Sequence, residues 1–580
     1  MIFKFFILSL LTFIINLTLN LTLQAQKLFP QNYFISPLDI PLYLSGTFAE
    51  LRTDHFHSGI DIRTNEMEGL IVHASASGYI SRIKVSAGGY GKALYITHPN
   101  GYVTVYGHLK QFSNPIADYV KKVQYERQSF EVEIFPDQVN FTVMSGDIIG
   151  FSGNTGSSGG PHLHFEIRES QSEKPMNPLL FGFTVDDKQP PVINILKVYP
   201  MGKGSKVDGK ESDAIFFVQD AGKSLTLSGN DTIIIEGSVY CGINTWDPFN
   251  SGANKNGVYS VRLFSDSTLV YEQCMVGCAF DETRYINSLI DYREFVRNKR
   301  TIQKSYIQPN NHLSIYNPGI GDGIIRLKDN EVRFMKYEVA DIAGNTSELS
   351  FYLRSEGDGM KPGKNEPDSA KQGTVFTYLH ENVFRESNII LHIPGKALYD
   401  TLTFEYSFIP GMKGTFSGIH KLHHSDVPLH EWCDLSLSPD SIPARLQQKA
   451  AVAKAGNANN LIFAGGNWEG GFFHTRIREF GDYCITVDTI PPEIRIEKSV
   501  GSSGVAIGDT ISFIVTDEFS GIGNYSGWMN GQWVLVEYDQ KNDRIYYVAD
   551  ERLIRGINNF ELTASDRRNN QTKLSTVLKY

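Results

Sequence analysis

The sequence predicts a mainly β protein, with an antiparallel β-sheet domain first and about three β-sandwich modules after it. Aromatic residues make up 12% of the 580 residues, with 28 Tyr and 36 Phe, and aromatic rings fit the pleated surface of a sheet. Short apolar runs that alternate with polar residues recur along the chain and are separated by Gly- and Asn-rich turns. Two distant sections also share one pattern of turns, which indicates a repeated module.

Length and composition limit the classes of protein to which the chain can belong. At roughly 150 residues per domain, the chain is long enough for about four domains. Apolar residues account for 41% and charged residues for 20%, which excludes a disordered or collagen-like chain. The formal net charge is −10 and no large basic region is present, so we expect no nucleic-acid partner.

The amino-terminal end predicts a signal peptide over residues 1–25. Lys4 precedes an apolar run over residues 5–15, and the small residue Ala25 follows. Leu23 fits the cleavage rule poorly, and the alternative is an uncleaved membrane anchor. Two Asn residues inside the segment argue against an anchor. We therefore expect an exported protein with no membrane span in the mature chain.

Five cysteines lie beyond the first 180 residues, and an exported setting permits disulfides. Cys433 and Cys484 fall within one expected domain, and Cys241 has two potential partners, Cys274 and Cys278. Five is an odd number, so at least one thiol is expected to stay unpaired within the chain. No Cys-x-x-Cys sequence is present, so a thiolate zinc site is not indicated.

The first domain is expected over residues 30–185. Residues 78–85 alternate between apolar and polar side chains, as a half-buried strand does. Residues 93–98 and 102–106 form two further strand-like runs that flank Asn100-Gly101, and Asn-Gly between two such runs is a strong hairpin signal.

The later sections show the repeat. An Asp three residues before a Pro-Pro pair opens one section at Asp187 and a second at Asp488, and a polar turn that begins with Asp341 or Asp566 closes each. Many short strands joined by such turns predict immunoglobulin-like β-sandwiches. The expected organisation after the first domain is an immunoglobulin-like module over 186–355, a linker over 356–373, a β-sandwich over 374–487 and an immunoglobulin-like module over 488–580.

The residues that carry chemistry gather in three motifs of the first domain. They are His57-Ser58-Gly59-Ile60-Asp61, Tyr106-Gly107-His108-Leu109 and Gly160-Pro161-His162-Leu163-His164-Phe165-Glu166. Residues i and i+2 of a strand point to one face, so His162 and His164 can project into one cleft. His57, Asp61 and His164 would make a three-ligand zinc set with the fourth position left for water, as in a catalytic zinc site. His108 closes a strand and could stand beside the metal.

These three motifs, in this order, resemble the M23 (lysostaphin-type) family of peptidoglycan metallopeptidases. The resemblance covers residues 50–180, and further matching stretches are Gly89-Tyr90-Gly91, His98-Pro99-Asn100-Gly101 and Gly146-Asp147-Ile148-Ile149-Gly150. It implies one Zn²⁺ per chain, held by His57, Asp61 and His164. It also implies that His108 and His162 are catalytic residues that handle protons and stabilise the transition state.

The function that the resemblance implies is an exported zinc metallo-endopeptidase that cuts peptide cross-links of bacterial peptidoglycan. The periplasm or envelope of a Gram-negative cell is the expected location, with secretion as an alternative. Cell-envelope proteins are candidate partners of the β modules. The competing hypothesis is a wall-bound scaffold or an activator of other wall hydrolases, since some relatives have lost their zinc ligands. All ligand positions are intact here, which favours the enzyme.

Other patterns give weaker signals. Gly156-Ser157-Ser158-Gly159-Gly160 matches the serine-hydrolase pattern Gly-x-Ser-x-Gly, but that pattern requires a helix next, and a β-like run follows. The helical protease signature His-Glu-x-x-His is absent. His420, His423, His424 and His430 form a second histidine cluster, more typical of a polar loop than of a metal site. His55 lies near the first motif and is a candidate to assist there.

Residues 110–145 form an insertion relative to the family pattern. Asn114 and Pro115 predict a helix start, and the apolar residues after them repeat at helical spacing. Alternating residues over 130–134 and a return run over 139–143 predict a hairpin after the helix. One interpretation is a simple elaboration of the sheet edge, and the other is that the helix and hairpin form one wall of the substrate cleft.

Overall fold

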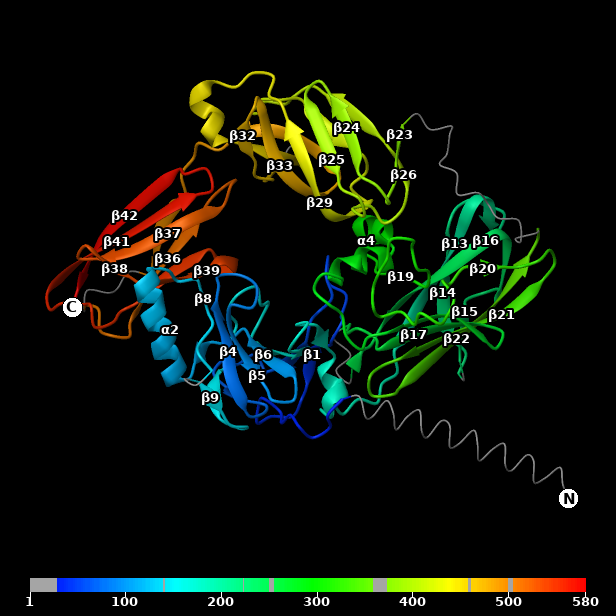
Figure 1. Cartoon of the computed structure of the whole chain (residues 1–580), viewed down its shortest axis with the longest axis horizontal. Helices are drawn as coiled ribbons and strands as arrows, with labels where there is room; N and C mark the ends of the chain where they lie inside the picture. The colour runs from blue at the N-terminus through cyan, green and yellow to red at the C-terminus, as the bar shows by residue number, and fades with distance from the viewer. Residues whose placement is uncertain are drawn as a thin grey trace.

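The structure is a computed structural model that describes residues 29–138, 141–222, 224–249, 255–357, 373–456, 460–498 and 504–580. The predicted signal peptide and nearly all of the predicted linker lie outside these residues. The prediction of a mainly β fold, with several β-sheet modules after the first domain, is confirmed (Figure 1). Within the described ranges, no helix is long and apolar enough to cross a bilayer.

Four large hydrophobic cores divide the described chain into four units, which we number along the sequence as unit 1 (29–186), unit 2 (187–357), unit 3 (373–487) and unit 4 (488–580). Apolar side chains from the β-strands line each core.

Unit 1 contains the three motifs and is built on a nine-stranded sheet, whose main path runs β1-β2-β11-β6-β5-β4-β8. Its elements are β1 Leu44–Gly46, β2 Ile60–Arg63, β3 Ile71–His73, β4 Gly78–Val85, β5 Lys92–Thr97, β6 Tyr102–Gly107, β7 Gln111–Phe112, α2 Asn114–Arg127, β8 Val132–Ile134, β9 Thr142–Val143, β10 Ile148–Phe151, β11 His162–Glu169, β12 Pro175–Met176 and the 3₁₀ helix η1 Pro178–Phe181. The predicted hairpin joins β5 to β6, and Gly101 in its turn has a φ of +86°, which glycine tolerates best.

Unit 2 is a ten-stranded sheet that curls on itself, because β16 pairs with β13 on one side and with β22 on the other. It therefore differs from a sandwich of two separate sheets, and the irregular sequence after residue 280 supplies its helices. Its elements are β13 Val192–Val207, β14 Ala214–Asp220, β15 Leu225–Leu227, β16 Thr232–Trp246, β17 Ser260–Ser265, β18 Thr268–Cys274, the 3₁₀ helix η3 Thr283–Tyr285, α3 Ile286–Leu289, α4 Tyr292–Asn298, β19 Gln303–Lys304, β20 Ile325–Arg326, β21 Val332–Ala340 and β22 Thr346–Ser355.

Unit 3 has two five-stranded sheets and a two-stranded one, and unit 4 has two four-stranded sheets. The elements of unit 3 are β23 Thr374–Phe376, β24 Asn382–Glu386, β25 Ile389–Ile393, β26 Leu402–Phe404, β27 Tyr406–Ile409, β28 Ile419–Leu422, β29 Pro428–Leu437, the 3₁₀ helix η4 Ala444–Lys449, β30 Ala450–Ala455, β31 Leu461–Phe463, β32 Asn467–Glu469, β33 Phe472–Glu479 and β34 Gly481–Val487. Those of unit 4 are β35 Glu493–Lys498, β36 Thr510–Thr516, β37 Ile522–Met529, β38 Gln532–Val534, β39 Val536–Asp539, the 3₁₀ helix η6 Gln540–Asn542, β40 Arg544–Val548, β41 Ile557–Asp566 and β42 Gln571–Lys579.

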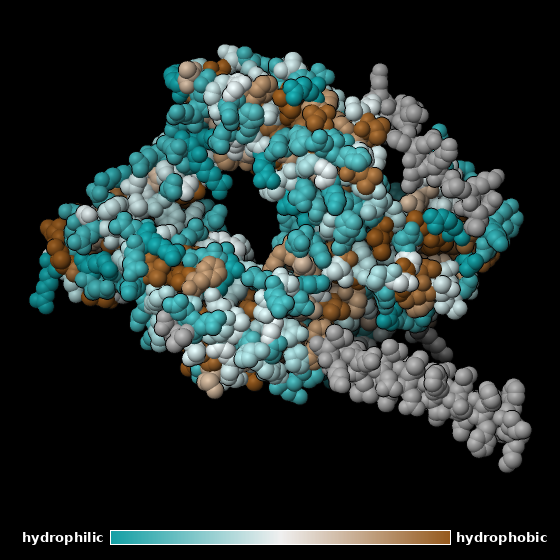
Figure 2. All heavy atoms as spheres, viewed as in Figure 1, coloured by the Kyte–Doolittle hydropathy of each residue, from teal (hydrophilic) through white to brown (hydrophobic). Residues whose placement is uncertain are grey.

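Contacts between successive units arrange the four units in a ring, and unit 4 returns to unit 1 (Figure 1). Phe249 of unit 2 is buried in the core of unit 1. Arg284 of unit 2 donates to the backbone oxygen of Leu429 in unit 3, and Lys449 of unit 3 donates to that of Arg568 in unit 4. The space-filling view shows an opening through the centre of the ring (Figure 2).

The ring closes where unit 4 contacts unit 1, in part through the insertion of residues 110–145. Tyr125 of α2 packs edge-on against Trp533 of unit 4, with ring centroids 5.1 Å apart, and its hydroxyl donates to Asp550. Lys92 of unit 1 forms an ion pair of 2.8 Å with Glu537 of unit 4. The contact between the first and last units therefore joins segments that lie more than 400 residues apart in the sequence.

The insertion takes the form of a sheet-edge elaboration. β8 and β9 both pair with β4, at the end of the sheet opposite to β2 and β11, and α2 faces unit 4. The interpretation of the helix and hairpin as a wall of the cleft stays a prediction, because only β5 lies between β4 and β6, the strand that leads to His108. The helix begins as predicted at Asn114, but its N-cap is Ser113, which makes no side-chain cap hydrogen bond.

Candidate metal centre and active site

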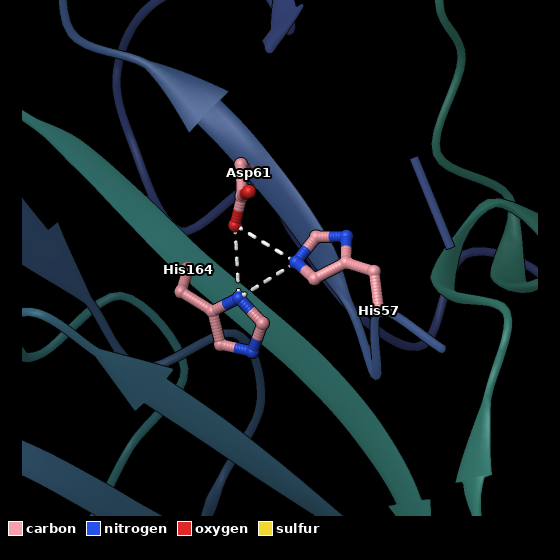
Figure 3. A group of neighbouring side chains, drawn as sticks. All are labelled: His57, Asp61 and His164. Carbon is pink, nitrogen blue, oxygen red and sulfur yellow. Dashed lines mark hydrogen bonds and ion pairs between the residues drawn. The ribbon is translucent and has the colours of Figure 1, made fainter. Parts of the chain in front are cut away.

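Two adjacent strands bring the first and third motifs together. Asp61 on β2 lies directly opposite His164 on β11 in the antiparallel register, and His57 precedes β2 on the same side (Figure 3). Asp61 Oδ1 lies 3.0 Å from His57 Nε2 and 2.9 Å from His164 Nδ1, and the two imidazole nitrogens are 3.1 Å apart. All three side chains are buried. The expected ligand set thus converges on one point.

The donor set fits a zinc ion. Zinc ligands about 2.0–2.1 Å from the metal in a tetrahedron lie roughly 3.3 Å from one another, close to the separations of these three atoms. Two neutral imidazoles and one carboxylate are ordinary zinc ligands. Gly46, the partner of Asp61 on β1, leaves room for the carboxylate. A Cβ at this position would lie 2.7 Å from Asp61 Oδ2.

The other nitrogen of each candidate ligand is fixed by a hydrogen-bond acceptor. His57 Nδ1 lies 2.8 Å from the backbone oxygen of Thr47, which can only accept, so this nitrogen carries the proton. His164 Nε2 lies 2.8 Å from Glu166 Oε1, which accepts in the same way. His57 Nε2 and His164 Nδ1 therefore present lone pairs to the centre. Such partners orient ligand imidazoles and raise their basicity.

Glu166 lies at the centre of a buried hydrogen-bond network. The sequence motifs had indicated no role for this residue. Its Oε1 accepts hydrogen bonds of 2.6 Å from both Ser58 and Tyr90, and Arg168 donates to its Oε2 at 2.5 Å. Glu166 is fully buried, and its ion pair with Arg168 stabilises its charge. The signal for both residues was the same i, i+2 alternation that aligned His162 with His164 on β11.

His162 and His108 lie beside the three candidate ligands. His162 Nδ1 is 2.8 Å from the backbone oxygen of Gly160, and His108 Nδ1 is 2.8 Å from that of Thr155. Both nitrogens must donate, so each Nε2 carries a lone pair. The two rings are 4.8 Å apart, and His162 Nε2 lies 3.4 Å from Asp61 Oδ1. The structure therefore brings all five expected site residues into one cluster.

The electrostatics of the cluster favour an ionised aspartate. Burial opposes the charge of Asp61, but the adjacent His57, His162 and His164 hold its pKa well below the usual range. Burial likewise opposes protonation of His164, yet its bonds to Asp61 and Glu166 raise its pKa to about 9. That proton and a metal ion would compete for the same lone pair, so metal binding would release it.

His108 is held in its neutral form. Burial, together with the nearby His164 and His162, lowers the pKa of His108 to about 3. Its backbone is left-handed, with a φ of +58°, a conformation that non-glycine residues rarely adopt. This conformation, together with the bond to Thr155, fixes the ring beside the cluster.

The weaker sequence signals give no second catalytic site. The Ser158 hydroxyl donates to the backbone oxygen of Gly160 and lies 3.2 Å from His162 Nδ1, which is a supporting role and not a nucleophile arrangement. His55 is exposed and pairs with Asp54. The second histidine cluster is spread over separate contacts, since His420 bonds to Tyr406 and His430 stacks on Tyr285. The five cysteines, all among the described residues, are free thiols.

The comparison with protein families agrees with this geometry. The pattern described as "Peptidase family M23" matches residues 55–125 and 134–178, which contain all five site residues. The chain carries a peptidase family M23 domain. A second pattern, described as "Zu5-like domain", matches residues 373–488, which are essentially unit 3.

Curated relatives of the M23 domain are bacterial. The "DD-carboxypeptidase/endopeptidase Mpg" of Neisseria meningitidis serogroup B is 38% identical over 129 residues, which is 22% of this chain and 23% of the relative. An "Uncharacterized metalloprotease" of Haemophilus influenzae is 34% identical over 111 residues, covering 19% of this chain and 18% of the relative. The chain thus spans less than a quarter of the length of these relatives.

Solved structures also align with the M23 domain. The catalytic domain of the antimicrobial peptidase lysostaphin from Staphylococcus simulans is 26% identical and covers 24% of this chain and 86% of its own, with a TM-score of 0.18. A zinc-containing peptidase from Vibrio cholerae is 22% identical and covers 27% of this chain and 41% of its own, with a TM-score of 0.20.

Unit 4 reaches the rim of the M23 domain. Lys541, in η6 between β39 and β40, donates hydrogen bonds of 2.9 Å to the side-chain oxygen of Asn154 and to the backbone oxygen of Ser158. Asn154 and Ser158 belong to the loop that leads into His162. Among the described residues, the later units supply no side chain to the five-residue cluster, but one of them supports a loop that borders it.

Proposed function

We propose that this chain is an exported zinc metallo-endopeptidase that hydrolyses peptide cross-links of bacterial peptidoglycan. The observation that carries the proposal is the convergence of His57 Nε2, Asp61 Oδ1 and His164 Nδ1 within 3.1 Å of one another. Membership of the M23 domain in a peptidase family, and the peptidase name of the Neisseria relative, support peptidoglycan as the substrate.

His57, Asp61 and His164 would hold one zinc ion through these three atoms. When bound, zinc supplies a Lewis acid that polarises the scissile carbonyl group and lowers the pKa of water. Glu166 keeps His164 in the tautomer that presents Nδ1, and Thr47 does the same for His57 through its backbone oxygen.

His162 is the general base of the proposed reaction. Its Nδ1 proton is committed to the oxygen of Gly160, so Nε2 is free to take a proton from the attacking water. It can then pass that proton to the leaving amine. His162 is only partly buried, so its ring borders the space that substrate must enter.

His108 has a different task. Its Nδ1 donates to Thr155 and its Nε2 therefore accepts, so the ring suits the orientation of the attacking water and not donation to an oxyanion. A neutral His108 also adds no positive charge beside the metal ligands.

The test is mass spectrometry of wall fragments after purified sacculi are incubated with the full mature chain. The proposal predicts loss of cross-linked muropeptide dimers and a matching gain of monomers, with the glycan strands intact. A wall-bound scaffold or activator predicts no change in cross-linking when the chain acts alone. Unchanged dimers in the presence of a zinc-loaded, folded chain would therefore favour the scaffold.

A further inference from the structure

Two clusters of three carboxylates lie outside the peptidase site. Asp187, Asp247 and Asp341 form one in unit 2, and Asp488, Asp517 and Asp566 form the other in unit 4. In each cluster, one oxygen from every side chain lies within 4.8 Å of the others. Five of the six residues are buried, so these are not the acidic patches that commonly occur on protein surfaces.

In unit 2, backbone amides orient the carboxylates. Asp187 accepts from the N–H two residues ahead at 3.1 Å, and Asp247 does the same at 3.2 Å. Asn345 donates its N–H to Asp341 Oδ1 at 2.9 Å, and its side-chain amide bridges Asp341 Oδ2 and the backbone oxygen of Asp187. These hydrogen bonds thus hold the three carboxylates so that they point to one place.

Unit 4 repeats these contacts bond for bond. Asp488 and Asp517 each accept from the N–H two residues ahead, at 3.2 and 3.1 Å. Asn570 donates its N–H to Asp566 Oδ1 at 2.9 Å, and its side-chain amide bridges Asp566 Oδ2 and the backbone oxygen of Asp488. The shared Asp before Pro-Pro and the shared Asp at the closing turn are therefore parts of one arrangement.

A second observation in unit 2 points to a missing ligand. Asn256 is 2% exposed, yet neither its side-chain oxygen nor its side-chain nitrogen has a hydrogen-bond partner. Its backbone exchanges two hydrogen bonds of 2.9 Å with Asp247, so the two residues face each other in antiparallel register. Side chains of such a pair project from the same face, which aims the Asn256 amide at the carboxylates.

Unit 4 has a matching orphan group. Ser520 is 1% exposed and its hydroxyl has no hydrogen-bond partner, while its backbone N–H donates to Asp488 Oδ2 at 3.2 Å. Asp517 Oδ2 also lacks a partner. Buried polar groups without partners are destabilising, and a bound ion would supply the missing partner.

Like charges act on the carboxylates in both clusters. Burial, followed by the charges of Asp187 and Asp341, raises the pKa of Asp247 to about 7. Burial also raises the pKa of Asp517, to which Asp488 and Asp566 add. Three acidic groups held together in this way are destabilising unless a cation neutralises them.

The chemistry of the donors selects the cation. All side-chain donors are oxygens, from carboxylates and an amide in unit 2 and from carboxylates and a hydroxyl in unit 4. Oxygen-only sets that carry several negative charges suit calcium, which takes six to eight oxygens in flexible geometry and accepts backbone oxygens and water as further ligands. Zinc prefers nitrogen and sulfur, as in the His57 site.

We propose that each cluster binds one calcium ion, and that the two ions fix two junctions of the ring. Phe249, two residues after Asp247, is buried in the core of unit 1, so the first site adjoins the M23 domain. Phe519, two residues after Asp517, packs against Phe463 of unit 3, with ring centroids 5.6 Å apart. An ion at each site would therefore stiffen the junction of units 1 and 2 and the junction of units 3 and 4.

The test is calorimetric titration of the full chain with CaCl₂ in calcium-depleted buffer. The proposal predicts two equivalents of calcium for the wild type, one for Asp247→Asn, one for Asp517→Asn and none for the double variant. Asp220→Asn, which changes an exposed carboxylate of unit 2, is the matched control and should keep both equivalents. Zinc content is measured in parallel and should be the same in all five proteins.

Thermal unfolding separates an ion site from a merely structural aspartate. Calcium at 100 times its Kd should raise the Tm of the wild type by about 5–10 °C and that of the double variant not at all. Without calcium, Asp247→Asn should melt above the wild type, because it removes one of three buried like charges. No calcium uptake by the wild type, two equivalents in each single variant, or uptake of Mg²⁺ in place of Ca²⁺ would overturn the proposal.

Discussion

The ammonium group of Lys541 lies 2.9 Å from the backbone oxygen of Ser158, although 383 residues separate the two in the chain. Ser158 in turn places its hydroxyl 3.2 Å from Nδ1 of His162, the proposed general base. The last unit of the ring therefore supports the loop that orients His162. Closure of the ring and the geometry of the active site are linked through this one side chain.

Replacing Lys541 by Ala should lower kcat by about 10-fold, because a small misplacement of a catalytic group costs up to ~10²-fold in rate. Zinc content and Tm should change little, since the side chain touches no metal ligand. Lys121→Ala is the matched control, because Lys121 also faces unit 4 but forms its ion pairs with Asp550 and Glu551. Equal kcat values for wild type and Lys541→Ala on a soluble cross-linked dimer would show that the contact has no catalytic consequence.

His162→Ala should keep zinc and lose turnover by about 10²–10⁴-fold, because it removes proton transfer and leaves the three ligand atoms in place. His108→Ala should also keep zinc, with a smaller loss, since it removes only the orientation of water. The measurements are metal analysis and steady-state kinetics on the same preparations. Wild-type turnover in the His162 variant would move the role of base to His108.

Glu166→Gln should weaken zinc binding by about 10–100-fold, because His164 loses the anionic partner that fixes its tautomer and raises its basicity. Competition with a chromogenic chelator measures the change. Tyr90→Phe is the control, since it removes one of the hydrogen bonds to Glu166 but keeps the carboxylate. If Glu166→Gln and Tyr90→Phe bind zinc equally well, the charge of Glu166 has no part in holding the metal.

Acid should weaken the junction of units 2 and 3 through His430. Burial, followed by the nearby positive charges of Arg478, Arg284 and His312, lowers the pKa of His430 to about 4. The folded-state pKa of His430 lies below the unfolded value of about 6.5. The stability that neutral His430 contributes is therefore complete above pH 6.5 and is lost as the pH falls toward 4.

His430→Phe keeps the stack on Tyr285 but cannot take up a proton. Between pH 7 and pH 5 its Tm should therefore fall less than that of the wild type. His424→Gln, which changes an exposed histidine of the same unit, should follow the wild type. A parallel loss of Tm in wild type and His430→Phe would exclude His430 as the source of acid sensitivity.

The motif residues were predictable because their chemistry is local. The alternation of His162 with His164, and the spacing of His57 and Asp61, already indicated a shared face and a three-ligand set. The same alternation extends to Glu166 and Arg168, but sequence gives no measure of burial, and only burial makes their ion pair part of the site.

Long-range packing set the limits of the prediction. The helix from Asn114 to Arg127 has the periodicity of an amphipathic helix whatever it packs against, so its contact with unit 4 could not be inferred. The curl of the unit 2 sheet depends on the pairing of β16 with β22, which are more than 100 residues apart. Asp187 and Asp488 were recognised as repeat markers, but only the folded chain adds Asp247 and Asp517 to them.

The most direct test of the proposed zinc site is the zinc content of the purified full chain and of its ligand variants, measured by inductively coupled plasma mass spectrometry. We expect one zinc per chain in the wild type and in His162→Ala, and almost none in His164→Ala and Asp61→Ala, because two remaining ligands hold the metal poorly. Full zinc occupancy in both ligand variants would contradict the assignment of His57, Asp61 and His164 as the metal site.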